Sequence, residues 1–187
     1  LEKLFPLGEK SFGYLDGPLN TLAPLYGEVL TLHEPLCYYR VHDSNEWAQV
    51  QLQPDKFSAY ITHDIGRMRY LQTHADAIGQ RIAAKPLDNS LNHLVYRLAS
   101  KKFVPEKHPL AENLLSIMYK GVRTALFAPN LTSGQRLVMA IWFPLVTMMP
   151  RPIALYATRM RLVPTSRHAF VRSLLNLVNA SRAAPPH

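Results

Sequence analysis

The stretch FSAYITHDIGRMRYLQTHADAIGQRI, residues 57–82, decides the fold class of this chain. Its apolar side chains recur every three or four residues, at Phe57, Ile61, Ile65, Met68, Leu71, Ala75, Ile78 and Ile82. This spacing is typical of one face of a long amphipathic helix. Pro54 suits the first turn of such a helix, and Lys85-Pro86 is its predicted stop. Gly66 and Gly79 each weaken it by about 1 kcal/mol, which leaves a break at either glycine open.

More helices are predicted downstream. They cover residues 89–102, a segment from Pro109 with Ile117 and Leu126 inward, a segment from Thr132, residues 152–163 and a segment from Ser166. Thr132 and Gln135 have the spacing of a capping box. Pro144 is predicted to kink or end the helix that follows this box.

The first 46 residues predict mixed structure. Residues 14–26 fit a short helix ended by Gly27, and residues 28–32 and 36–41 fit strands. The expected fold is therefore mainly α with a small α/β N-terminal part. We expect two units, residues 1–47 and residues 48–187.

Charge is distributed unevenly along the chain. Residues 1–95 contain 8 Lys and Arg residues and 11 Asp and Glu residues. Residues 96–187 contain 13 Lys and Arg residues but only 2 Asp and Glu residues. A basic half of this kind suits a membrane surface, phosphorylated lipids or nucleic acid. No nucleic-acid recognition motif accompanies the charge, so we expect no nucleic-acid partner.

Cysteine usage and motifs exclude several classes of protein. The lone Cys37 forms no internal disulfide and no cysteine zinc site, which fits a reducing cytosol. The chain has no Gly-rich phosphate loop and no HExxH zinc motif. The N-terminus shows no secretory signal. The apolar run at residues 137–149 is short for a bilayer, so it predicts either a core helix or an interfacial helix.

Several short motifs follow one another in residues 4–47. They are Leu15-Asp16-Gly17, then Leu22-Ala23-Pro24-Leu25-Tyr26-Gly27, then Glu34-Pro35-Leu36, then Tyr39-Arg40-Val41-His42, and Asn45. In this order they resemble the closing part of the catalytic domain of family 2 glycosyltransferases. The resemblance covers about a quarter of the chain.

The resemblance implies a GT-A type domain that moves a sugar from a nucleotide-sugar donor to an acceptor. It places Asp16 at the start of a helix as the general base that takes the proton of the acceptor hydroxyl. The residues alone favour another role, because Asp is a common N-cap at such positions.

The resemblance also assigns His42 to a divalent metal, Mg or Mn, or to the donor diphosphate. Arg40 is a candidate to pair with the diphosphate or with an acidic neighbour. Taken alone, His42 fits a solvated histidine at a strand end. The Asp-x-Asp metal motif of the family is absent from the chain. The nucleotide-binding half would precede Leu1, so we expect this fragment to be inactive by itself.

One further polar set lies on the predicted long helix. Its members are His63, Arg67, Tyr70 and His74. Because it contains no acidic ligand at metal spacing, we interpret it as a solvated face.

Two functions remain open from the sequence. The first is the C-terminal part of a glycosyltransferase of cell-surface polysaccharide or glycolipid synthesis, with a nucleotide-sugar donor and a saccharide or lipid-linked acceptor. It would be cytoplasmic, peripheral on the inner face of the membrane through residues 96–187. The alternative is a non-enzymatic helical module that binds a membrane surface or a partner protein through its basic half.

Overall fold

The computed structural model describes residues 16–30, 32, 34, 36–38, 52–82 and 86–163, and their regular structure is entirely helical. The α-helices are α1 (Asp16–Tyr26), α2 (Lys56–Ala77), α3 (Leu91–Phe103), α4 (Leu114–Phe127), α5 (Ser133–Met148) and α6 (Arg151–Leu162). Two 3-10 turns, η1 (Pro86–Asn89) and η2 (Pro105–Lys107), flank α3. The prediction of a mainly α chain is confirmed. The helix predicted from Ser166 lies outside the described residues.

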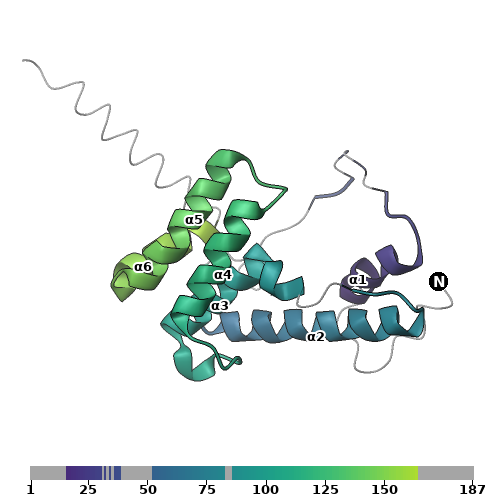
Figure 1. Ribbon diagram of the computed structural model, residues 1–187, viewed down its shortest axis with the longest axis horizontal. Coiled ribbons are helices and arrows are strands. Elements are labelled where there is room, and N and C mark those ends of the chain that lie inside the picture. Colours follow the sequence, from purple (N-terminus) through teal and green to yellow (C-terminus); the bar gives the residue numbers. More distant parts are fainter. Residues whose placement is uncertain are drawn as a thin grey trace, which may run out of the picture.

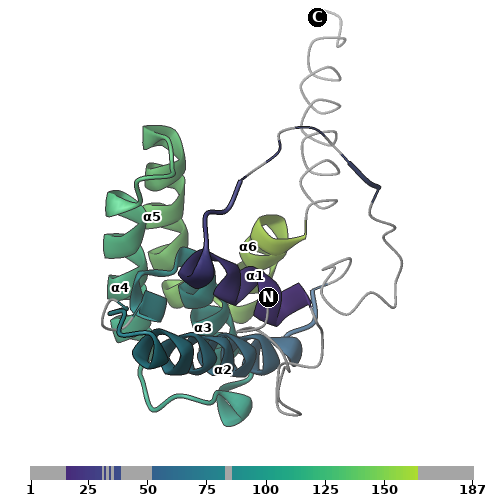
Figure 2. The ribbon, with the colours of Figure 1, turned by 90° about the vertical axis from the view of Figure 1, so that its right-hand side faces the viewer.

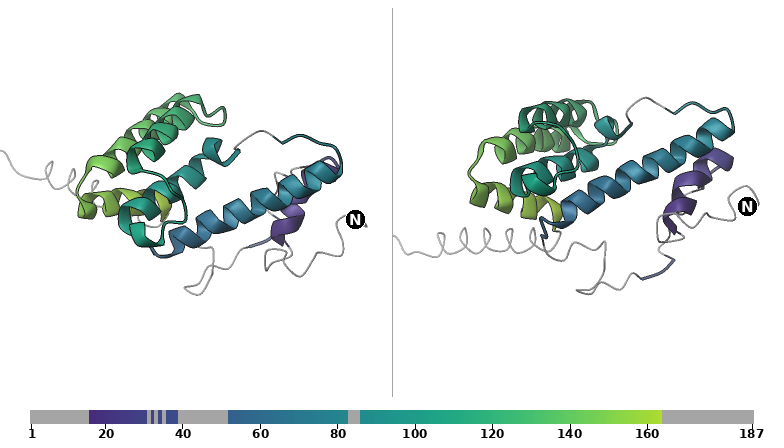
Figure 3. Two further views of the ribbon diagram at one scale, coloured as in Figure 1. Left: turned by 60° about the horizontal axis from the view of Figure 1, so that its bottom comes forward. Right: turned by 90° about the horizontal axis from the view of Figure 1, so that it is seen from below.

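The helices are arranged around α3, which contacts α2, α4, α5 and α6. Its side chains Leu94, Val95, Leu98 and Ala99 are fully buried. In Figure 1, α2 runs along the base of the molecule, and α4 and α5 stand beside each other above one end of it. α1 packs near the other end of α2 (Figure 2). In both views of Figure 3, α1 lies beside α2 and away from α4 and α5.

α2 ends earlier than predicted. Gly79 has a positive φ of 69°, its N–H donates to Asp76 O at 3.1 Å, and the N–H of Gln80 donates to Ala75 O at 2.9 Å. These two bonds form a Schellman motif, which a glycine in the left-handed region favours. The stop predicted at residues 85–86 is therefore wrong, because the backbone already turns at Gly79.

α4 begins later than predicted, at Leu114 and not at Pro109. The side chain of Asn113 caps it by accepting from the N–H of Ser116 at 2.7 Å. An N-cap of this kind supplies an acceptor for an N–H that has no partner within the helix. The residues before Asn113 are thereby left outside the helix, where Glu112 contacts α3.

The start of α5 agrees with the sequence. Thr132 Oγ1 accepts from the N–H of Gln135 at 3.3 Å, and Gln135 Oε1 accepts from the N–H of Thr132 at 3.0 Å. This reciprocal pair confirms the predicted capping box. Pro144 does not end the helix, which continues to Met148. Burial of the side chains around Pro144, including Phe143 and Val146, offsets the one backbone hydrogen bond that proline cannot make.

The predicted strands are not found in the part of the N-terminal region that the structure describes. Residues 28–30, 32 and 36–38 are irregular, and Leu30 and Tyr38 are exposed. A short hairpin needs further strands or a packed face for stability. The helix that shares this region, α1, packs on α2 instead. Residues 39–41 lie outside the described part of the chain.

α4 and α5 approach closely at Gly121. A Cβ atom at this position would overlap the ring of Phe143, which is fully buried. Glycine is therefore required here by the close approach of the two helices and not by its backbone conformation.

Gly121→Ala is expected to lower the free energy of unfolding by about 1–3 kcal/mol, the usual range for an overpacked core. The higher helix propensity of alanine, worth about 1 kcal/mol, offsets part of the loss. Gly134→Ala is the matched control, because no atom lies within 4 Å of its added Cβ. Urea titrations of both variants measure the difference, and equal stability of the two would contradict the close packing.

Candidate functional site

The three residues predicted for catalysis and donor binding are only partly described. Asp16 lies in α1 and is also the first described residue of the chain, so its predicted place at the start of a helix stays a prediction. Arg40, His42 and the neighbouring Asn45 lie outside the described residues. Within the described residues, no group of three or more His, Cys, Asp or Glu side chains is placed to hold a metal ion. The expected metal and diphosphate contacts of His42 therefore stay predictions.

The helix that contains Asp16, α1, is anchored on α2. Tyr26, its last residue, has its hydroxyl 3.0 Å from Nδ1 of His74, and the two rings meet edge to face with centroids 6.2 Å apart. Tyr70 also meets this imidazole edge to face, with centroids 4.6 Å apart. The prediction that His74 belongs to a solvated face is wrong, because its ring forms the contact between α1 and α2.

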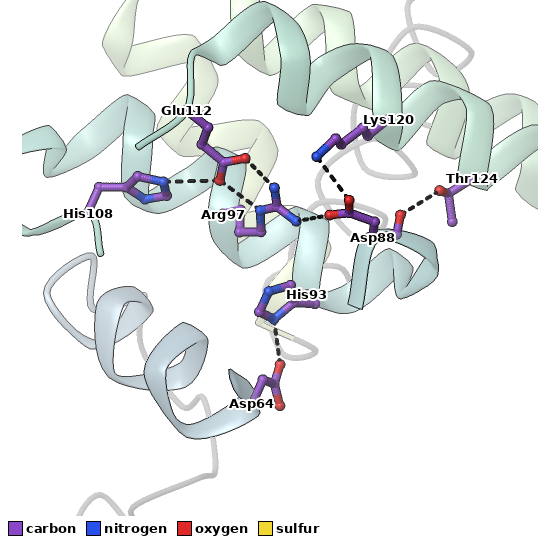
Figure 4. A network of polar contacts seen from close by, with 8 residues as sticks. All are labelled: Asp64, Asp88, His93, Arg97, His108, Glu112, Lys120 and Thr124. Carbon is purple, nitrogen blue, oxygen red and sulfur yellow. Dashed lines mark hydrogen bonds and ion pairs between the residues drawn. The ribbon is translucent and has the colours of Figure 1, made fainter. Parts of the chain in front are cut away.

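The most densely bonded polar cluster surrounds Arg97 on α3. Its guanidinium donates through Nε to Glu112 Oε1 at 2.7 Å, through Nη2 to Glu112 Oε2, and through Nη1 to Asp88 Oδ1 at 2.6 Å. His108 Nε2 lies 3.2 Å from Glu112 Oε1, and Lys120 Nζ donates to Asp88 Oδ2 at 3.1 Å. Figure 4 shows the two carboxylates on either side of the guanidinium. We call these five residues the Arg97 cluster.

The charges of the Arg97 cluster balance. Burial opposes ionisation of both carboxyls, yet hydrogen bonds and charge from Arg97 outweigh it and hold the pKa of Glu112 below its usual value. The pKa of Asp88 is lowered for the same reason, with Lys120 as a second cation. Two cations thus face two carboxylates. Since its two cations and two carboxylates pair with one another, the cluster joins η1 and the residue before α4 to α3 and offers little to a charged ligand.

His108 is the pH-sensitive member of the cluster. Its side chain is fully buried, and this burial lowers the pKa of the imidazole despite the neighbouring carboxylate of Glu112. Nδ1 of His108 is buried without a hydrogen-bond partner. A proton added there would create a buried donor without an acceptor, which is costly.

Acidification is therefore expected to destabilise the protein through His108. The unfolded histidine takes up its proton near pH 6.5, but the folded one does so only at lower pH. Between these values the unfolded state holds more protons, so the free energy of unfolding falls as pH falls, by at most about 1.4 kcal/mol per pH unit. Urea titrations from pH 8 down to pH 5, approximately, should show a shallower decline for His108→Gln than for wild type. Parallel curves would contradict this.

A second buried histidine joins α2 to α3. His93 is 1% exposed, and its Nδ1 lies 2.9 Å from Asp64 Oδ2 (Figure 4). Asp64 also pairs with Arg67 at 3.3 Å. The pair positions α2 against the centre of the molecule, and it forms no group with a nucleophile.

A basic groove of about 760 Å³ opens at the N-terminus of α3. Arg123 and Arg161 line it, together with polar side chains that include Asn92 and Asn130, and no carboxylate is among its lining residues. Arg161 Nη2 donates to Asn92 Oδ1 at 3.3 Å. The groove has no partly assembled catalytic set, because its lining contains no His, Cys, Asp or Glu.

The apolar run of residues 137–149 is half buried. Phe143 and Val146 are fully buried, whereas Leu137, Ile141 and Met148 are 59%, 54% and 74% exposed. One side of this helix is therefore in the core, as the first alternative predicted, and the opposite side is exposed; whether that side meets a membrane interface stays a prediction. Among the described residues, no helix is long and apolar enough to cross a membrane.

Two features were missed by the sequence analysis. The Arg97 cluster joins residues that are far apart along the chain, so no local spacing signals it. The exposed apolar side of α4, with Leu115 and Tyr119 61% and 66% exposed, was not singled out. Its signal was present in the sequence, because α4 and α5 are apolar on more than one side.

Comparisons with known proteins give no relative. No protein-family model, no curated protein and no solved structure matches this chain.

Proposed function

We propose that this chain is the C-terminal part of a family 2 glycosyltransferase, in which residues 1–47 close a GT-A type catalytic domain. The ordered motifs from Leu15 to Asn45 carry the proposal. The helical conformation of the described residues from Asp16 to Tyr26 is consistent with it, because the family places its general base in a helix at this point. The anchoring of α1 on α2 by Tyr26 and His74 is also consistent with it, since it ties this helix to the helical body.

In this proposal the carboxylate of Asp16 accepts the proton of the acceptor hydroxyl while that oxygen attacks the anomeric carbon of the donor sugar. Arg40 and His42 neutralise charge that develops on the departing nucleotide diphosphate. The products are a glycosylated acceptor and a nucleoside diphosphate. The acceptor is a saccharide or a lipid-linked saccharide of a cell-surface polysaccharide or glycolipid.

A divalent metal, Mg or Mn, would supply further positive charge at the diphosphate. His42 offers it a single imidazole nitrogen, and the described residues contain no group of three or more His, Cys, Asp or Glu placed to hold it. Most of its ligands would therefore come from the nucleotide-binding half of the enzyme. The proposed location is cytoplasmic, at the inner face of the cell membrane, where the lone Cys37 would stay reduced.

His42→Ala in the full-length enzyme tests the donor side of the proposal. Because the partner of His42 is present before reaction, the variant should bind the nucleoside diphosphate more weakly and also transfer sugar more slowly. Calorimetry with the nucleoside diphosphate and Mg, beside a transfer assay, measures both. His63→Ala, the same change on α2, is the control and should leave both values unchanged. Unaltered binding in His42→Ala would remove His42 from the donor site.

A second candidate function has its own observation. From residue 113 onwards the sequence has no Asp or Glu, and α4 and α5 expose apolar side chains. These features also fit a non-enzymatic helical module that docks on a membrane or a partner protein. Sugar transfer by the full-length protein would support the glycosyltransferase. A full-length protein that neither transfers sugar nor binds the donor would support the non-enzymatic docking module.

A further inference from the structure

α4 and α5 together present an exposed apolar surface, which we call the outer face. It consists of Leu115, Tyr119 and Leu126 of α4 and Leu137, Ile141 and Met148 of α5. These side chains are between 45% and 74% exposed. Monomeric proteins rarely leave contiguous apolar patches of this kind in water unless they bind something there.

Each helix contributes one stripe to the outer face. The three residues of each stripe are spaced by four and then seven positions, so they lie along one side of their helix. The opposite sides are buried, with Ile117 and Ala125 on α4 and Phe143 and Val146 on α5. The stripes therefore face away from the core that α3 occupies.

The two stripes form one surface because α4 and α5 pack against each other along their length. Only residues 128–132 connect them, so they run antiparallel and stand side by side in Figure 2. Leu126 and Leu137 consequently lie toward the connected end, and Leu115 and Met148 lie toward the other. The outer face thus extends over the whole hairpin.

Positive charge predominates beside the outer face. No Asp or Glu occurs in residues 113–163, and Glu112 just before them is paired with Arg97. Arg123 is exposed on α4 one turn from Tyr119, Arg159 is exposed on α6, and Arg151 of α6 is exposed but also donates to Phe103 O at 3.2 Å. Lys120 is the cation of α4 that is already paired, with Asp88. The charge of this side of the molecule therefore complements an anionic partner.

We propose that the outer face docks on an anionic lipid bilayer, with the aliphatic stripes at the boundary of the acyl chains and the arginines among the lipid phosphates. Apolar residues rimmed by arginine and carrying a tyrosine suit this boundary. A second copy of the chain would bring two sets of cations together. A nucleic acid would satisfy the cations but leave the apolar stripes in water. The proposal stands on this surface and does not depend on the glycosyltransferase assignment.

The hairpin would lie flat on the bilayer. α4 and α5 have 14 and 16 residues, about 21–24 Å of helix, and only one side of each is available for lipid. Interfacial helices of this type bury their apolar side about 5–10 Å deep. α3 and α2 then stay on the aqueous side.

Cosedimentation of the 187-residue chain with lipid vesicles tests the proposal. We expect binding to vesicles of phosphatidylglycerol and phosphatidylcholine in equal parts, and much weaker binding to pure phosphatidylcholine. Binding should fall as salt rises, because at 1 M salt charges are screened within about 3 Å. Leu137→Ser combined with Ile141→Ser should weaken binding by about tenfold or more, because two buried apolar side chains are lost.

Matched variants separate the outer face from other segments. Val29→Ser with Leu30→Ser removes two exposed apolar side chains elsewhere and should leave binding unchanged. Arg123→Gln should weaken binding to anionic vesicles more than Arg69→Gln on α2. Circular dichroism should show the same folded signal for every variant, because all these residues are exposed.

Three results would overturn the proposal. The first is no binding of the wild type to anionic vesicles. The second is undiminished binding of the variant with Leu137→Ser and Ile141→Ser, which would assign lipid binding to another segment. The third is a wild-type dimer that this variant converts to a monomer, by light scattering, without vesicle binding, because the occupant would then be a second copy of the chain.

Discussion

Asp16→Asn in the full-length enzyme is expected to lower the rate of sugar transfer by about 10²–10⁴-fold, the usual contribution of a general base. The amide has nearly the shape of the carboxylate but cannot accept the proton of the acceptor hydroxyl. Donor binding should stay unchanged, because the proton moves only during reaction. A steady-state transfer assay gives the rate, and calorimetry with the nucleoside diphosphate gives the binding.

The same substitution distinguishes a base from a helix cap. Asn and Asp cap helices about equally well, so Asp16→Asn should hardly change the free energy of unfolding under either role. The control is Asp55→Asn, at the N-cap of α2, where the side chain makes no capping bond. Asp55→Asn should transfer sugar at the wild-type rate. If Asp16→Asn did so too, Asp16 would not be in the active site and the glycosyltransferase assignment would lose its main residue.

Arg97→Met is expected to lower the free energy of unfolding by about 3–5 kcal/mol, because it leaves buried carboxylates without their cation. Arg97 is 5% exposed, and the side chain of Glu112 is 10% exposed. Urea unfolding at neutral pH measures the loss. Lys107→Met is the control, since Lys107 pairs with Asp55 at an exposed site and surface pairs contribute little.

The pH dependence and a second substitution make this prediction specific. The pKa values of Asp88 and Glu112 are lowered in the folded protein, so their stabilisation is present above the unfolded pKa values near 4 and is lost as pH falls. The difference in free energy of unfolding between wild type and Arg97→Met should therefore become smaller as the pH falls below about 4. Adding Glu112→Gln should restore part of the stability at neutral pH, because one unpaired charge is removed. A deficit independent of pH would indicate lost packing and not lost charge.

Local signals in the sequence predicted local structure well. The three- and four-residue spacing from Phe57 predicted α2, and the capping box of Thr132 and Gln135 predicted the start of α5. Both depend on residues within a few positions of each other. The end of α2 was missed because a glycine can either weaken a helix or end it, and only the left-handed φ of Gly79 decides between these.

Non-local contacts set the limit of the prediction. Arg97 meets Asp88 and Glu112 only because η1 and the start of α4 fold back onto α3, and no pattern in the sequence encodes that meeting. Leu126 was predicted to face inward but is 45% exposed. Periodicity cannot tell which of two apolar sides of a helix meets the core, because both sides satisfy the same spacing.

Two side-chain contacts, one near the middle of α2 and one near its C-terminal end, connect this helix to its neighbours. Asp64 holds it to α3 through His93, and ten residues later His74 holds α1 through Tyr26. Ten helical residues span about 15 Å. This length of α2 therefore sets the distance between α3 and the contact with α1, the helix that contains Asp16. If the outer face binds lipid and Asp16 is the general base proposed above, this length sets the height above the bilayer at which Asp16 would contact a sugar acceptor. Lengthening or shortening α2 would then change which acceptors can be reached without altering a single residue that touches them.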